Sequence, residues 1–175
     1  MQMKFLVLML TIFLYSCGSA VIVDYDNNTN FSAYNTFDFY PSIDSGLSEL
    51  DNKRIMYALD SLMQSNGFQK SQSPDLLINF FTKEVLTNSR NTIGIGVGSG
   101  GVNGGFGVSG GIPIGGNEIE QQFTLDFIDA KEDALIWQGV LNGRYKERAT
   151  PAQKERYYYT IIQKILKKYP TLKNK

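Results

Sequence analysis

Two runs of alternating apolar and polar residues, separated by a short polar turn, constrain the fold of this chain more than any other feature. In residues 119–129 (IEQQFTLDFID), every second residue from Phe123 to Phe127 is apolar. Residues 134–145 (ALIWQGVLNGRY) form the second run, and residues 130–133 (AKED) form the turn. A period of two indicates a strand with one buried face, and a short turn joins two such strands into an antiparallel hairpin. We therefore expect the core to be built on a β-sheet.

Other segments predict strands that extend this hairpin. Residues 21–25 (VIVDY) and 75–82 (DLLINFFT) are apolar runs of strand length, and residues 85–90 continue or border the second run. Residues 31–40 (FSAYNTFDFY) finish in alternating aromatic and polar residues, so we expect this segment to end in a strand.

Two segments predict amphipathic helices. Residues 47–66 repeat apolar side chains at helical spacing, with Ser48 as a cap and Gly67 just beyond the end. Residues 150–169 begin with Thr-Pro-Ala-Gln, which combines a cap, a proline in the first turn and a capping-box glutamine. Pro170 is expected to end this second helix. We predict an α+β fold, a mostly antiparallel sheet with both helices packed on one face.

The N-terminus predicts export from the cytoplasm. Lys4 precedes an apolar run over residues 5–14, which has the length of a secretory signal and is too short to span a bilayer. The run ends in Leu-Tyr-Ser-Cys, which resembles a bacterial lipobox, although Tyr15 is bulkier than the usual residue at that permissive position. The resemblance implies that residues 1–16 are a signal peptide and that Cys17 carries a diacylglycerol thioether.

Two alternatives to lipidation stay open at this point. Cys17 could follow an ordinary signal peptide by chance, or the apolar run could remain as an uncleaved membrane anchor. If Cys17 is lipidated, the membrane becomes a partner of the chain, because several acyl chains together hold a protein durably. Gly18 and Ser19 place no acidic residue after the cysteine. By analogy with sorting signals, we expect delivery to the outer membrane, with the domain facing the periplasm.

Composition restricts the chemistry of residues 17–175, which we predict to form a single domain. Lys and Arg number 17 and balance 17 Asp and Glu, so nothing indicates a nucleic-acid surface. The chain contains no His, and its only Cys is Cys17. Histidine-based catalytic arrangements, disulfides and the usual zinc ligands are therefore excluded. We predict that the protein is not an enzyme and has no catalytic residues, no metal site and no cofactor.

A Gly-rich insert spans about residues 93–117, and about half of residues 93–116 are Gly. A phosphate-binding loop would need a following Lys and a helix, but no Lys or Arg lies between Arg90 and Lys131. The insert could form two Gly-rich strands in a hairpin, or a mobile loop. It could also serve as an interaction segment whose exposed strands pair with another protein.

Two side-chain clusters allow a functional interpretation beside a structural one. An acidic cluster around the hairpin turn could bind calcium or form a carboxylate pair, but it lacks calcium-loop spacing, so we interpret it as a solvated turn. Aromatic side chains could line a lipid groove, but their strand spacing favours core packing. The acidic residues are Asp126, Asp129, Glu132 and Asp133; the aromatic residues are Phe37, Phe39, Phe80, Phe81, Phe123, Phe127 and Trp137. Among Tyr157, Tyr158 and Tyr159, which occupy three sides of a helix, at least one should be exposed or at an interface.

Several motifs together resemble the DUF4136 family of uncharacterised bacterial lipoproteins, in its Bacteroidetes form. The motifs are the lipobox Cys17, VDYD at 23–26, FSAYNTFDF at 31–39, GF at 67–68, PDLLINF at 74–80, the Gly-rich insert, DFID at 126–129 and LIWQG at 135–139. The resemblance covers most of the mature chain and implies no known activity, so no catalytic residue is carried over.

Three hypotheses for function follow. The first is a lipid-anchored envelope lipoprotein with a non-enzymatic binding, assembly or structural role. The second is a carrier of a lipid or small apolar ligand held between the sheet and the helices. The third is an envelope hydrolase that uses two carboxylates, which would require Asp126 and Asp129 to face one another across a cleft.

Overall fold

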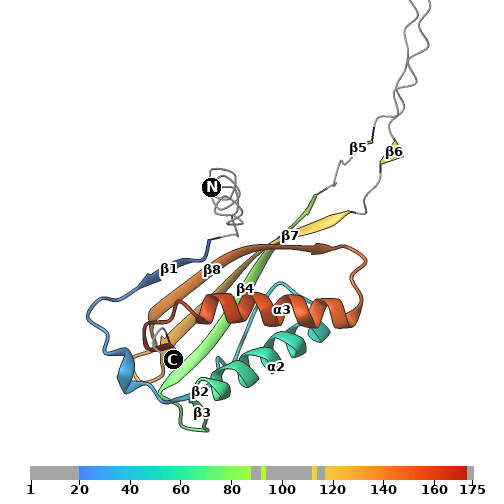
Figure 1. The fold of residues 1–175 in the computed structure, drawn as a ribbon. Coiled ribbons are helices and arrows are strands. Elements are labelled where there is room, and N and C mark those ends of the chain that lie inside the picture. Colours follow the sequence, from blue (N-terminus) through green and yellow to red (C-terminus); the bar gives the residue numbers. More distant parts are fainter. Residues whose placement is uncertain (1–19, 88–91, 94–111, 114–116, 173–175) are drawn as a thin grey trace, which may run out of the picture.

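The computed structural model of the chain describes residues 20–87, 92–93, 112–113 and 117–172 (Figure 1). These residues form a six-stranded sheet, two α-helices, two short 3₁₀ helices and a separate two-stranded ladder. The sheet contains β1 (Ile22–Tyr25), β2 (Thr36–Phe39), β3 (Gln69–Lys70), β4 (Leu76–Thr87), β7 (Glu118–Asp129) and β8 (Ala134–Lys146), and the helices are α2 (Glu49–Ser65), α3 (Pro151–Leu166), η2 (Phe31–Ala33) and η3 (Pro170–Leu172).

The strand order in the sheet is β1-β8-β7-β4-β2-β3. The pairs β1–β8, β8–β7 and β7–β4 are antiparallel, whereas β2 runs parallel to both β4 and β3. Parallel neighbours require a crossover connection, and α2 supplies it between β2 and β3. The predicted α+β class with a mostly antiparallel sheet is confirmed.

The hairpin predicted from the alternating runs is the central feature of the sheet. Strands β7 and β8 pair along their whole length, from Glu118 opposite Lys146 to Asp129 opposite Ala134. The register shifts beside Phe127, where β8 contains one extra residue, so the hairpin carries a β-bulge. In the turn, Asp133 has a φ of 50° and makes the left-handed step that reverses the chain.

Both helices begin where the sequence predicts. The Ser48 side chain caps α2, and Gly67 follows the helix with a φ of 96°. Thr150 and Gln153 form the predicted capping box at the start of α3.

The end of α3 differs from the prediction. The helix stops at Leu166, before the expected end at Pro170. The last residues before Pro170 form a tighter turn, in which Lys168 and Tyr169 donate to the carbonyls of Ile165 and Leu166, three residues before them. A residue that precedes proline disfavours the helical conformation, and Tyr169 is fully buried in this turn.

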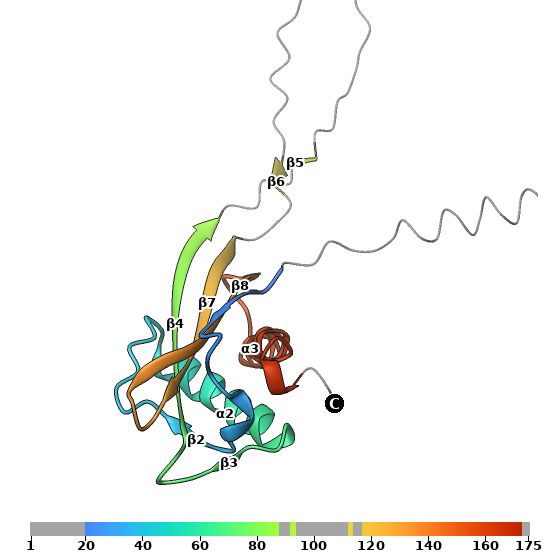
Figure 2. The same ribbon diagram turned by 90° about the vertical axis from the view of Figure 1, so that its left-hand side faces the viewer.

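Both helices lie on one face of the sheet, as predicted (Figure 2). The core fills the layer between them with side chains from β4, β7, β8 and the buried faces of α2 and α3. Large side chains with no exposed surface dominate this layer: Phe37, Ile55, Leu59, Met63, Phe80, Phe123, Phe127, Trp137, Ile162 and Tyr169.

An aromatic cluster closes one end of the core around Tyr169. Its ring lies 4.9 Å from the ring of Phe127, 5.6 Å from Trp137 and 5.4 Å from Phe31, all in edge-on geometry. Aromatic pairs at such distances contribute beyond their buried area. The cluster therefore joins the C-terminal segment, the 3₁₀ helix η2 and the central hairpin.

The Gly-rich insert leaves the sheet at the end of β4 and returns at the start of β7, where Thr87 pairs with Glu118. Within the insert, β5 (Thr92–Ile93) and β6 (Ile112–Pro113) pair antiparallel. Most of the insert lies outside the described residues, and so do residues 1–19, which contain the expected signal peptide and Cys17. Whether the Gly-rich insert forms a hairpin or a loop therefore stays a prediction.

Candidate functional site

One face of the sheet carries both helices, and no described element covers the other face, which we call the open face (Figure 2). The antiparallel register brings the outward side chains of neighbouring strands into rows, because residues directly opposite one another share a face. From one end to the other, the rows on β4, β7 and β8 are Leu77–Ile128–Leu135, Asn79–Asp126–Gln138, Phe81–Thr124–Val140, Lys83–Gln122–Asn142 and Val85–Glu120–Arg144.

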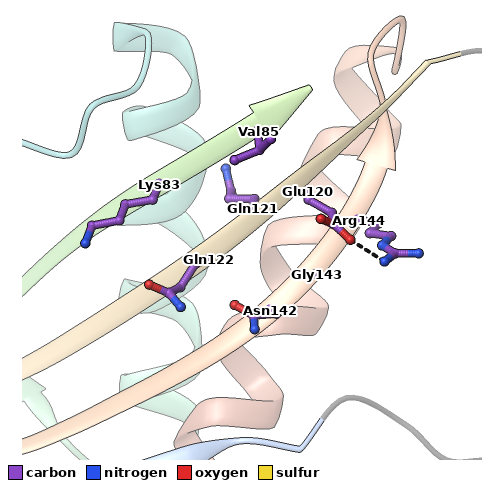
Figure 3. Close-up of a pocket in the computed structure, with 8 residues that line it drawn as sticks. All are labelled: Lys83, Val85, Glu120, Gln121, Gln122, Asn142, Gly143 and Arg144. Carbon is purple, nitrogen blue, oxygen red and sulfur yellow. Dashed lines mark hydrogen bonds and ion pairs between the residues drawn. The ribbon is translucent and has the colours of Figure 1, made fainter. Parts of the chain in front are cut away.

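A shallow polar groove occupies the end of the open face nearest the Gly-rich insert (Figure 3). Its volume is about 740 Å³, and its outward side chains are those of the last two rows, with Gln121 and Gly143 completing the lining. Arg144 pairs with Glu120 across the hairpin, whereas the amides of Gln122 and Asn142 are exposed. The groove therefore presents the Lys83 ammonium and two side-chain amides to solvent.

The row Asn79–Asp126–Gln138 lies beside the central row of the open face, toward the end that is far from the Gly-rich insert. Asp126 is only 8 % exposed, although no described element lies above it. Its carboxylate accepts hydrogen bonds from Gln138 Nε2 at 2.8 Å and from Asn79 Nδ2 at 3.4 Å. Burial raises the pKa of Asp126 above its usual range, and the two amide donors oppose that rise.

Apolar side chains flank this polar row on both sides. Leu77, Ile128 and Leu135 form the row on one side, and Phe81 and Val140 lie on the other. Ile22 on β1 extends the second row, because it pairs with Val140. Leu135 and Ile22 are 53 % and 67 % exposed. Solvated faces of antiparallel sheets are usually polar, so these exposed apolar side chains make the open face the candidate functional site of the domain.

A polar cluster on the helical side of the sheet was not predicted from the sequence. Glu84 accepts hydrogen bonds from Gln121 Nε2 at 2.6 Å and from the Tyr145 hydroxyl at 2.8 Å. Burial, together with the hydrogen bond to Glu84, raises the pKa of Tyr145 strongly. In the alternating pattern of β7, Gln121 is a polar residue at a position where the period of two predicts an inward side chain. A polar residue at such a position is the only sign of a buried polar contact that the sequence contains.

A buried ion pair joins the two helices. Asp51 is 4 % exposed and accepts from Lys154 Nζ at 2.7 Å and from Arg54 Nη1 at 2.8 Å. Burial alone would raise the pKa of Asp51, but the contacts with Lys154 and Arg54 lower it below its usual value. Asp51 lies in the first turn of α2, and its partner Lys154 is 103 residues away, so no local pattern in the sequence predicts this contact.

The acidic cluster predicted as a solvated turn divides between two faces of the sheet. Asp126 points to the open face, whereas Asp129 accepts from the Tyr34 hydroxyl at 2.6 Å and from the amides of Lys131 and Glu132. Asp129 thus fixes the hairpin turn. The hydrolase hypothesis requires Asp129 to face Asp126 across a cleft, and the two carboxylates do not face one another. In the described part of the chain, no group of three or more acidic or cysteine side chains is arranged to hold a metal ion.

Most of the aromatic residues pack in the core, as their strand spacing predicts. Phe37, Phe80, Phe123, Phe127 and Trp137 have no exposed surface. The expectation is wrong for Phe81, which lies on the open face because the strand period directs alternate residues outward. Phe39 is half-buried under the Lys70 ammonium.

The three consecutive tyrosines of α3 divide as predicted. Tyr158 is buried, Tyr157 is half-buried and Tyr159 is 43 % exposed. Across the residues that the structure describes, no helix is both long and apolar enough to cross a membrane.

Together these features define an α+β domain with a sheet that is covered by helices on one face and open on the other. The chain belongs to the DUF4136 family, described as a domain of unknown function, whose model matches residues 21–171. The resemblance drawn from the sequence motifs is thereby confirmed. No curated protein matches the sequence significantly.

Two solved structures that align with TM-scores above 0.5 share the fold of this domain. A DUF4136 family protein from Bacteroides thetaiotaomicron VPI-5482 aligns with a TM-score of 0.52 at 18% identity, over 91% of this chain and 100% of that chain. A PDZ domain protein from Parabacteroides distasonis ATCC 8503 aligns with a TM-score of 0.54 at 18% identity, over 95% of this chain. Our chain corresponds to 40% of that longer protein. A minor lipoprotein from Acinetobacter baumannii is similar at a TM-score of 0.35 and 12% identity, over 76% of this chain and 90% of that chain.

Proposed function

We propose that the protein is a lipid-anchored lipoprotein of the bacterial envelope that binds another envelope component in a non-enzymatic binding, assembly or structural role. The observation that carries the proposal is the position of the lipobox Cys17, five residues before the first strand of the family domain. Five residues span at most about 17 Å when fully extended. A lipid on Cys17 would therefore hold the sheet close to the bilayer surface.

The open face supports a binding role. It combines exposed apolar side chains, a polar groove and a buried carboxylate on a surface that no described element covers. The absence of His from the whole sequence, with a single Cys reserved for lipid, is in keeping with binding instead of catalysis. The carrier hypothesis gains no support, because side chains as large as Trp137 and Phe123 fill the space between the sheet and the helices.

We further propose delivery to the outer membrane with the domain on the periplasmic side. The support is the sequence after the cysteine, Gly18 and Ser19, which contains no acidic residue. Density-gradient fractionation should place the protein with outer-membrane markers. Protease added to intact cells should leave it uncut, and protease added after the outer membrane is opened should digest it.

The Gly-rich segment is proposed as a second point of contact for a protein partner. Between Glu84 and Glu118 the only charged residue is Arg90, so this stretch has little charge to oppose pairing with another chain. Replacing residues 93–116 by a short Gly-Ser linker should remove a subset of partners captured by crosslinking in the native envelope. An unchanged set of partners would refute this role.

Labelling with radioactive palmitate tests the anchor directly. Wild-type protein should incorporate label, and Cys17→Ala should incorporate none while remaining unprocessed. The matched control is Ser19→Ala, which leaves the lipobox intact. An intact mass that shows an unmodified Cys17 thiol in envelope-extracted protein would overturn the proposal.

A further inference from the structure

The open face has the dimensions of a protein–protein interface. Its three long strands, β4, β7 and β8, contain 12, 12 and 13 residues. With about 3.3 Å per residue and about 4.8 Å between strands, these strands and the short flanking strands cover about 700 Å². A standard stable interface buries about 800 Å² per partner. A single partner could therefore cover most of this face.

The charges on the open face separate toward its two ends. Asp24 on β1 and Asp38 on β2 point outward near Asp126, because they pair with Gln138 and Leu77. Among the residues that the structure describes, no ion pair involves Asp24, Asp38 or Asp126, so this end of the face is acidic. At the opposite end, the polar groove carries Lys83 together with Arg144 and its ion-pair partner Glu120. Two cations against one carboxylate leave this end with a net positive charge, which Lys83 presents to solvent.

Apolar residues lie between the two charged ends. Phe81, Thr124 and Val140 form the central row, and Ile22 extends it on β1. A face with an apolar centre, one acidic end and one basic end is complementary to itself after a rotation of 180°. Such self-complementarity is what a two-fold interface between identical subunits requires.

We infer that the partner of the open face is a second copy of this chain, packed sheet against sheet about a two-fold axis near Val140. The acidic end of each copy lies over the polar groove of the other. Two sheets packed in this way form a sandwich with helices on both outer surfaces, and their strands cross at the usual angles of sheet packing. The inference deepens the proposed function, because it assigns the assembly role of the open face to self-association.

Disulfide trapping tests the geometry on the intact lipoprotein in its membrane. The chain has one Cys, Cys17, so a cysteine introduced elsewhere is the only thiol free to crosslink once Cys17 is lipidated. Val140→Cys, near the axis, should form a dimer of twice the subunit mass under mild oxidation. The control Tyr57→Cys, 78 % exposed on the helical side, should stay monomeric.

Sedimentation of the chain from residue 17 with Cys17→Ser tests self-association without the lipid. This form keeps the whole core, because every buried core residue lies between Phe31 and Tyr169. Leu135→Lys should raise the dimer dissociation constant at least tenfold, whereas Tyr57→Lys should leave it unchanged. Circular dichroism on both variants would show that the fold is retained.

Charge reversal tests directly whether the acidic end of one copy pairs with the polar groove of the other. Lys83→Glu with Arg144→Glu should weaken the dimer, and so should Asp24→Lys with Asp38→Lys. Mixing the two doubly substituted chains should restore association as a heterodimer. A monomeric wild type, or trapping of Val140→Cys to a different protein, would overturn the inference. Palmitate labelling reports on the anchor alone, so failure of the anchor and failure of the dimer are separate results.

Discussion

Gly139 packs directly against two buried side chains of the core, so Gly139→Ala should destabilise the protein strongly. A Cβ at this position would lie 2.5 Å from Ile165 Cγ2 and 2.5 Å from Trp137 Cη2. Favourable contacts between carbon atoms are about 3.5–4.0 Å long, so each neighbour would have to move by about 1 Å. Ile165 and Trp137 are both fully buried and have little room to move.

Overpacking of a filled core costs about 1–3 kcal/mol. Because two immobile side chains clash at once, we expect the upper end, about 3 kcal/mol. For a domain of this size, each 1 kcal/mol lowers Tm by about 2–4 °C, so the loss should be about 6–12 °C. Trp137 is the only tryptophan, and urea unfolding monitored by its fluorescence measures the change directly.

The control for this prediction is Asn142→Ala, on the same strand but pointing outward and exposed, which should change stability by less than about 0.5 kcal/mol. Ile165→Ala combined with Gly139→Ala should cost less than the sum of the single changes, because the smaller side chain makes room for the added methyl group. If Gly139→Ala unfolds within 0.5 kcal/mol of wild type, the account of this contact is wrong.

Three further predictions concern charge and capping. Asp51→Asn should cost about 1–3 kcal/mol at neutral pH, because it removes the negative partner of the partly buried Lys154 and Arg54 side chains. Since the folded pKa of Asp51 is lowered, the wild type should lose this stability as pH falls through that pKa, and the variant should lack the loss in acid urea titrations. Asp126→Asn should have the opposite effect on stability at neutral pH. Because the folded pKa of Asp126 is raised, its contribution to stability falls as pH rises toward neutrality. The variant should therefore be at least as stable as wild type at pH 7, and a clear destabilisation at that pH would contradict this. Thr150→Ala should cost about 1 kcal/mol by removing the capping box with Gln153, measured by thermal unfolding, with Thr160→Ala as a mid-helix comparison.

Local rules predicted the elements of this fold well. The hairpin of β7 and β8 follows from period-two alternation, and the starts of α2 and α3 follow from the caps at Ser48 and Thr150. These signals lie within a few residues of one another, so a sequence displays them directly.

Contacts between distant residues could not be predicted in the same way. The parallel pairing of β2 with β4 depends on which strands become neighbours, and the burial of Tyr169 depends on a core that distant segments build together. The Asp51–Lys154 ion pair and the contact of Glu84 with Gln121 also join segments that are far apart in the chain. No local pattern encodes such a pairing.

The sequence by itself determined the α+β class, the family, the absence of histidine chemistry and the expected lipid anchor at Cys17, because composition and short motifs carry that information. Only the tertiary structure decided which face of the sheet the helices cover and which face stays open. Strand order and register gather Asp126, Phe81, Lys83 and Val140 on one surface, although they come from three strands. A binding surface of this kind exists only after those strands have paired.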